Sequence, residues 1–183
     1  MKQTKKITLS AASVALTVLF MALGAYIELF DLTSAALSSI IMAFVFIEVG
    51  KPYTYLVWLG SSLLGFVFFS HSLVPITYFL VFGIYPILKA YIEKMKKPLW
   101  IPIKLLVFAV CSAAIIFTST VLFGIPFFED DIAIPWLKEN AAIFKVAVYL
   151  GLVAALMVYD YFMTMMIRAY FSAFRKRIAH LSK

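Results

Sequence analysis

Residues Ile7 to Ile27, ITLSAASVALTVLFMALGAYI, decide the fold class of this chain. A helix needs about 20 apolar residues to cross the hydrocarbon core of a bilayer, and this uncharged run is that long. Its first half is crowded with small side chains, namely Ser10, Ala11, Ala12, Ser13 and Ala15. The run therefore predicts a transmembrane helix that packs closely against another helix, because small residues let two backbones approach.

The composition of the whole chain supports a membrane protein. Of its 183 residues, 64% are hydrophobic and 14% are charged, whereas a soluble domain carries roughly 25% charged residues. The mean hydropathy is +1.02. The length fits a single domain, residues 1–183, and the lone Cys111 excludes an internal disulfide framework and offers no metal cluster.

Six apolar segments predict an all-α bundle of six transmembrane helices, at about 7–29, 32–49, 53–70, 73–93, 101–123 and 141–167. The third segment is short. Hydroxyl side chains in the second predict that it faces protein rather than lipid; they are Thr33, Ser34, Ser38 and Ser39. Pro75 and Pro102 fall in first turns, where proline is tolerated. Pro86 lies inside the fourth segment, where it should kink the helix.

The distribution of basic residues predicts the orientation. Fourteen of the 16 basic residues precede the first span, follow the sixth, or lie in the connections after the second and fourth, and only Lys138 and Lys145 lie on the other side. The positive-inside rule then places both termini in the cytoplasm. We attribute the net charge of +7 to these regions rather than to nucleic-acid binding. Two clusters suit anionic lipid: Lys94, Lys96 and Lys97, and Arg175, Lys176 and Arg177.

A second interpretation of the first segment stays open. The basic start MKQTKK, the apolar run and the small residues of Ala22 to Ala25 are also features of a secretory signal peptide. Cleavage there would leave five spans with the same orientation.

Catalytic motifs are not found in the sequence, so neither an enzymatic reaction nor a cofactor is predicted. The two histidines, His71 and His180, fall in an outer loop and in the tail, away from the middle of the membrane. Tyr159-Asp160 is half of an aspartyl intramembrane protease motif, and the second half is missing. No zinc-protease motif, phosphate-binding loop or dinucleotide fingerprint occurs.

Asp160 nevertheless requires an explanation, because an ionisable group inside a span is costly. It would lie about 28 Å along the sixth helix, at ~1.5 Å per residue, and so near the cytoplasmic side. It could serve as a proton or ion site, or it could tie the sixth helix to a neighbour through Lys89 or Thr164.

Aromatic residues gather in the outer half of the predicted bundle, with a few polar side chains among them. Such a surface could bind a planar ligand, although an interfacial aromatic belt is the alternative. Lys145 could meet an anionic ligand or extend its amine to the membrane surface. The candidate substrate-binding residues are Lys145, Asn140, Tyr149, Tyr78, Thr77, His71 and Trp136.

The small residues of the first helix form a strip. Ala11 and Ala15 are four apart, Ala22 returns to the same face, and Thr8 lies one turn before. This strip could pack inside the chain's own bundle, in a homodimer, or against another protein.

The chain resembles the substrate-binding S component of an energy-coupling factor (ECF) transporter. The resemblance rests on the basic start, AASVA (Ala11 to Ala15), the six spans, LSSIIMAFVFIEVG (Leu37 to Gly50), FGIYPILKAYIEK (Phe82 to Lys94) and the Asp of the sixth helix. It implies a bacterial cell-membrane protein whose partners are a small-molecule nutrient, a transmembrane coupling subunit and two ATPase subunits.

In that family the AxxxA face of the first helix docks onto the coupling subunit, which implies docking through Ala11, Ala15 and Ala22 here. The ligand lies near the outer face, against the fourth to sixth helices. Lys2 stands where the metal-uptake branch has a His, so the resemblance implies a vitamin or related organic nutrient rather than nickel or cobalt. The alternative function is a membrane scaffold or assembly protein, and a proton-coupled carrier using Asp160 is a third hypothesis.

Overall fold

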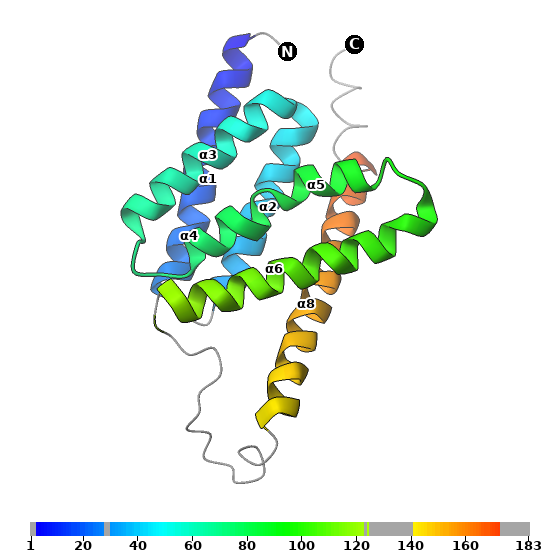
Figure 1. Ribbon diagram of the computed structural model, residues 1–183. Helices are drawn as coiled ribbons and strands as arrows, with labels where there is room; N and C mark the ends of the chain where they lie inside the picture. The colour runs from blue at the N-terminus through cyan, green and yellow to red at the C-terminus, as the bar shows by residue number, and fades with distance from the viewer. Residues whose placement is uncertain (1–2, 28–29, 123, 125–140, 173–183) are drawn as a thin grey trace. The chain divides into compact units, whose positions relative to one another are not determined.

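The computed structural model describes residues 3–27, 30–122, 124 and 141–172. The regular elements of this described part are all helices (Figure 1). In chain order they are α1 (Gln3–Tyr26), α2 (Asp31–Glu48), α3 (Lys51–Phe68), α4 (Val74–Thr77), η2 (Tyr78–Phe82), α5 (Tyr85–Ile92), η3 (Lys97–Leu99), α6 (Trp100–Leu122) and α8 (Ala141–Tyr170).

Five helices of the described part are long and apolar enough to cross a membrane, and together they indicate a multi-pass membrane protein. They are Gln3–Tyr26, Asp31–Glu48, Val74–Ile92, Lys97–Val121 and Ala142–Tyr170. The helix α3 is not among them, although it has 18 residues like α2, because its mean hydropathy is too low. The all-helical class is therefore confirmed, while the sixth span and the cytoplasmic termini stay predictions.

The chain divides into two compact units. Unit 1 comprises Met1–Lys94 and Tyr159–Lys183, and unit 2 comprises Met95–Val158. In unit 2 the hydroxyl of Tyr149 donates a hydrogen bond to the carbonyl of Ala109 at 2.8 Å, which links the first part of α8 to α6. Lys89 and Lys104, both counted from the sequence in the connection between the fourth and fifth spans, lie inside α5 and α6 and are buried. The single domain 1–183 stays a prediction.

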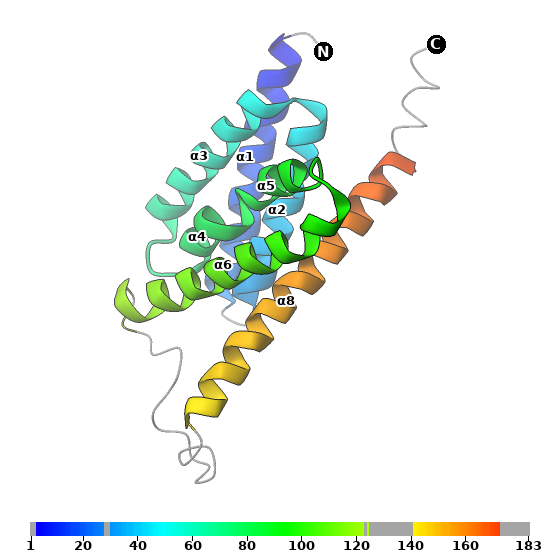
Figure 2. The same ribbon diagram turned by 45° about the vertical axis from the view of Figure 1, so that its right-hand side comes forward.

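In unit 1, α1 lies beside α2 and α3 (Figures 1 and 2). Its buried face consists of Ser10, Ser13, Thr17, Met21 and Gly24. A Cβ on Gly24 would lie only 1.9 Å from the Ser34 hydroxyl oxygen, so glycine is what permits this contact between α1 and α2.

The hydroxyl residues of α2 behave as predicted, with one exception. Ser34, Ser38 and Ser39 are buried against protein. Thr33 is exposed in the first turn, where its hydroxyl donates to the carbonyl of Phe30 at 3.0 Å.

The fourth apolar segment is interrupted near Pro86, as predicted. It runs through α4, the π-helical turn η2 and α5, with a turn at Gly83 and Ile84. The Gly83 amide donates to the carbonyl of Tyr78, five residues back, at 2.7 Å. The Phe79 carbonyl would be the acceptor in an ordinary α-helix. It accepts a hydrogen bond from the Trp58 indole instead, at 3.2 Å.

Three contacts define one end of unit 1. Lys6 lies over the ring of Tyr53 at 5.7 Å. Lys51 donates to the Tyr91 hydroxyl at 3.1 Å, and the Tyr170 hydroxyl donates to Glu48 at 2.7 Å. These contacts gather the first turns of α1 and α3 with the last turns of α2, α5 and α8. We call this the basic end, and its cations include Lys5, Lys6, Lys51, Lys94 and Arg168.

The opposite end of unit 1 is aromatic. Tyr26, at the end of α1, packs edge-on against Phe69, which follows α3, with ring centroids 6.2 Å apart. Phe68 lies against Phe69 at the same centroid separation. We call this the aromatic end; the end of α1 and the start of α4 lie there as well.

Candidate functional site

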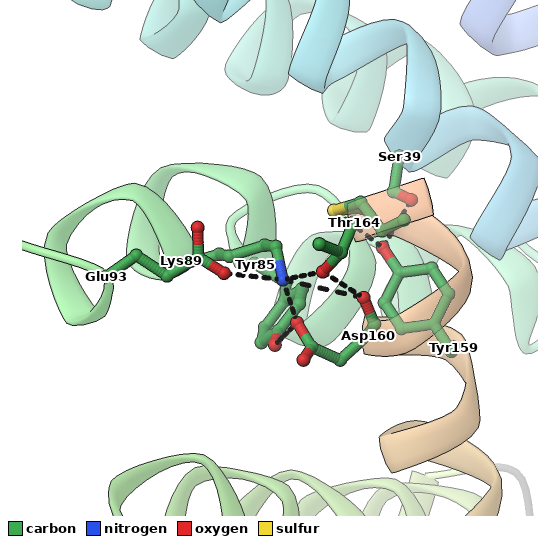
Figure 3. Close-up of polar contacts among 8 residues, drawn as sticks. Ser39, Tyr85, Lys89, Glu93, Tyr159, Asp160 and Thr164 are labelled. Carbon is green, nitrogen blue, oxygen red and sulfur yellow. Dashed lines mark hydrogen bonds and ion pairs between the residues drawn. The ribbon is translucent and has the colours of Figure 1, made fainter. Parts of the chain in front are cut away.

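A buried ionic cluster joins α5 to α8 in unit 1 (Figure 3). The Lys89 ammonium forms an ion pair with the Asp160 carboxylate. It also donates to the Thr164 hydroxyl at 2.7 Å and reaches Glu93 at 2.9 Å. Lys89 is only 2% exposed, so the polar partners that it finds here replace water around its charge.

Helical spacing explains how the sequence builds this cluster. Tyr85, Lys89 and Glu93 are each four residues apart on α5, and so are Asp160 and Thr164 on α8. Residues at this spacing lie on one face of a helix. One polar stripe of α5 therefore meets one polar stripe of α8, and the prediction that Asp160 pairs with Lys89 or Thr164 is confirmed because Lys89 contacts both.

Two hydroxyl contacts extend the cluster. The Tyr85 hydroxyl donates to the Asp160 carboxylate at 2.6 Å, and the hydroxyls of Tyr159 and Ser39 are hydrogen-bonded to each other. Figure 3 shows that Ser39 comes from α2, so three helices meet at this point. Sequence reasoning missed Tyr85, although its position one turn before Lys89 was a usable signal.

An aromatic group continues from the cluster toward α3. Tyr159 packs edge-on against Phe82 at 5.0 Å between centroids and lies 5.6 Å from the ring of Tyr85. Tyr78 is fully buried, and its hydroxyl lies 3.0 Å from that of Ser61. In the adjacent contact, the Trp58 ring stacks on Phe79 at 4.9 Å.

The chemistry of the ionic cluster favours a structural role. A buried charge is stable only when it is paired and hydrogen-bonded, and the contacts around Lys89 and Asp160 meet that requirement. Among the described residues, no group of three or more His, Cys, Asp or Glu side chains could hold a metal ion. The arrangement can fix α5, α2 and the last part of α8 to one another.

The predicted substrate-binding residues fall into three groups. Thr77 and Tyr78 are buried in unit 1, and His71 is exposed in a turn of the same unit. Lys145 is exposed and Tyr149 half-buried on the part of α8 that belongs to unit 2. Asn140 and Trp136 lie outside the described residues. Their shared role in binding stays a prediction.

The predicted docking residues lie on the outer face of α1. Ala11 and Ala15 are exposed, and Ala22 is half-buried. The hydroxyl-bearing strip on the other face fills the contact with α2 and α3. Within unit 1, Ala11 and Ala15 therefore lie outside the contact of α1 with α2 and α3, and their role in docking stays a prediction.

Comparison with known proteins gives no significant match to a family model, to a curated protein or to a solved structure.

Proposed function

We propose that the chain is the substrate-capture subunit of an ATP-driven importer of the ECF type, located in a bacterial cell membrane. Its ligand would be a vitamin or a related small organic nutrient. Its partners would be a transmembrane coupling subunit and two ATPase subunits. The observation that carries the proposal is the exposure of Ala11 and Ala15 on α1.

The two faces of α1 differ in what they contact. One face, mostly of small residues and including Met21, is buried against α2 and α3 between Ser10 and Gly24. The opposite face presents Ala11 and Ala15 outward. Membrane helices associate through close backbone packing at small residues, since lipid provides no hydrophobic drive between them. An outward alanine pair four residues apart is therefore suited to a helix of another protein.

The charges of unit 1 support the proposed orientation. Lys6, Lys51, Lys94 and Arg168 gather at the basic end, and the positive-inside rule assigns such an end to the cytoplasm. Ala11 lies about 12 Å along α1 from Gln3, at ~1.5 Å per residue. The docking strip would then begin in the cytoplasmic half of the membrane, on the side where ATPase subunits act.

The aromatic end suits ligand capture from outside. Tyr26, Phe68 and Phe69 form its rim, and Thr77 and Tyr78 are buried on the chain that follows. Aromatic surfaces with a few polar groups bind planar organic molecules. Lys145, in unit 2, stays a separate candidate for contact with an anionic ligand, on the sequence alone.

The decisive experiment replaces the two outward alanines. Ala11→Trp combined with Ala15→Trp should abolish co-purification with the coupling and ATPase subunits of the same cell, because indoles would hold the helices apart. Ala154→Trp with Ala155→Trp is the matched control, since both of these alanines are exposed on α8; its complex should stay intact. The thermal midpoint of each isolated variant should stay near that of the unmodified chain.

Two results would contradict the proposal. Normal complex assembly by the Ala11 and Ala15 variant would exclude docking through this face. The second result concerns the isolated chain, purified without any coupling subunit. If the unmodified chain is a dimer and the same variant is a monomer, the scaffold or assembly protein is favoured instead.

A further inference from the structure

Three connected hollows form one furrow on unit 1. The first, of about 370 Å³, is an open depression on the first turns of α1, lined by Thr4, Lys5, Thr8, Leu9 and Ala12. It shares Leu9 and Ala12 with a groove of about 280 Å³ between α1 and α2. That groove shares Ile40 and Phe44 with a third, of about 250 Å³, between α2 and α8. We call the three together the furrow.

The furrow has two limbs on either side of a ridge. Ile40 and Phe44 of α2 form the ridge, because both line the α1–α2 groove and the α2–α8 groove. One limb runs along α1 to Lys5. The other runs along α8 to Ala169 and Tyr170. Both limbs therefore reach the basic end.

The length of the furrow along α1 matches the thickness of one leaflet of a bilayer. From Lys5 to Leu16, which line opposite ends of the first limb, α1 rises about 16 Å at ~1.5 Å per residue. One leaflet contributes about half of a hydrocarbon core ~30 Å thick. A long partner helix would cross both leaflets, whereas acyl chains of one leaflet end near this depth.

We propose that the furrow binds one diacyl phospholipid with an anionic headgroup. Each limb holds one acyl chain, and the Ile40–Phe44 ridge separates the two chains. The headgroup lies at the basic end, where Lys5 lines the furrow and Lys6 and Lys51 lie in the first turns of α1 and α3.

The positive charge at the basic end selects an anionic headgroup. The acidic side chains that the described structure places at the basic end include Glu48, which accepts a hydrogen bond from Tyr170, and Glu93, which pairs with Lys89. Each basic residue near an anionic membrane surface contributes about 1 kcal/mol. A phosphatidylglycerol headgroup carries a net negative charge that phosphatidylcholine lacks, so lipids with identical acyl chains should differ in retention.

The test uses the purified full chain in detergent and native mass spectrometry. Dioleoylphosphatidylglycerol and dioleoylphosphatidylcholine are added separately at equal concentration. We expect one phosphatidylglycerol molecule to be retained per chain, and phosphatidylcholine to be retained several-fold less. Lys5→Gln should lower phosphatidylglycerol retention about fivefold, the ratio equivalent to ~1 kcal/mol. Lys145→Gln, which removes an exposed cation of unit 2 that belongs neither to the basic end nor to the lining of the furrow, is the matched control and should change retention little.

Two further variants test the limbs. Ala12→Trp and Ala169→Trp each fill one limb at an exposed position, and each should lower phosphatidylglycerol retention about tenfold. Ala155→Trp places the same indole on an exposed surface of unit 2 and should leave it unchanged. Equal retention of the two lipids by the unmodified chain would overturn the proposal. Unchanged phosphatidylglycerol retention in both Ala12→Trp and Ala169→Trp would also overturn it. If those variants instead lost a protein partner in cells, the furrow would be a protein-docking surface and the proposal would be wrong.

Discussion

Removing Lys89 should destabilise the protein strongly, because it leaves the buried partner of an ion pair without its counter-charge. Lys89 is 2% exposed and contacts Asp160, Thr164 and Glu93. Lys89→Met retains much of the aliphatic stem but leaves the buried carboxylate of Asp160 without this cation. Breaking one partner of a buried ion pair typically costs about 3–5 kcal/mol. A chain of this size loses roughly 2–4 °C of thermal midpoint per kcal/mol, so the midpoint should fall by about 6–20 °C.

Asp160→Asn is the milder change at the same contact. The amide oxygen of Asn can still accept from Lys89 and from the Tyr85 hydroxyl, which lies 2.6 Å from the carboxylate. Its midpoint should therefore fall less than that of Lys89→Met. The double change Lys89→Met with Asp160→Leu removes both charges, and replacement of a buried pair by apolar residues is often nearly neutral. It should recover more than half of the loss.

The assay is thermal unfolding of the purified chain in one detergent, followed by tryptophan fluorescence. Lys96→Met is the matched control, because Lys96 is exposed and surface substitutions usually change stability by less than about 0.5 kcal/mol. If Lys89→Met unfolds within 2 °C of the unmodified chain, as roughly one kcal/mol or less would give, the cluster does not stabilise the fold. A double variant less stable than Lys89→Met alone would refute the charge-pair reasoning in the same way.

Three further predictions concern Gly83, the side of the membrane on which the C-terminus lies, and Lys145. Gly83→Ala should lower stability by about 1–3 kcal/mol, because its Cβ would lie 2.5 Å from Cδ1 of Trp58. Gly151→Ala is the control in the same thermal assay, because nothing lies within 4 Å of its added Cβ, and it should be neutral or slightly stabilising. If both variants lose the same stability, the packing argument is refuted. A reporter fused after Lys183 should be active only in the cytoplasm, and an external C-terminus would contradict the positive-inside assignment. Lys145→Met should weaken binding of an anionic nutrient measured by calorimetry, with thermal stability unchanged, whereas equal affinity would remove Lys145 from the site.

The sequence was most informative where charges are rare. Because few ionisable residues occur inside the apolar segments, Asp160 stood out and its partner Lys89 could be named before the structure was known. Tyr85, Ser39 and Tyr159 could not be found in this way. A hydroxyl costs far less to bury than a charge, so its presence in a span does not require a specific partner. Its contacts depend on the packing of three helices, which no local pattern determines.

Helix boundaries were predictable to the extent that proline and glycine set them. Pro86 indicated an interruption in the fourth segment, and the structure places one at Gly83 and Ile84. The π-helical turn η2 was not predicted. Its free Phe79 carbonyl accepts a hydrogen bond from Trp58, which lies 21 residues earlier in the chain, on α3. Similarly, the third segment reads as a span from its apolar residues, but α3 is not among the five helices that meet the length and hydropathy required.

The orientation of α1 was the question that the sequence could not answer, because small residues occur on both of its faces. The structure turns the hydroxyl-bearing face inward and leaves Ala11 and Ala15 outside. Ala12 lies next to Ala11 in sequence but about 100° around the helix, where it lines the furrow. The two proposals therefore concern neighbouring surfaces of α1 that a single set of variants separates. Ala11→Trp with Ala15→Trp should remove the coupling subunit and spare phospholipid retention, and Ala12→Trp should do the reverse. Loss of both properties in both variants would mean that lipid and partner share one surface, and would refute the separation argued here.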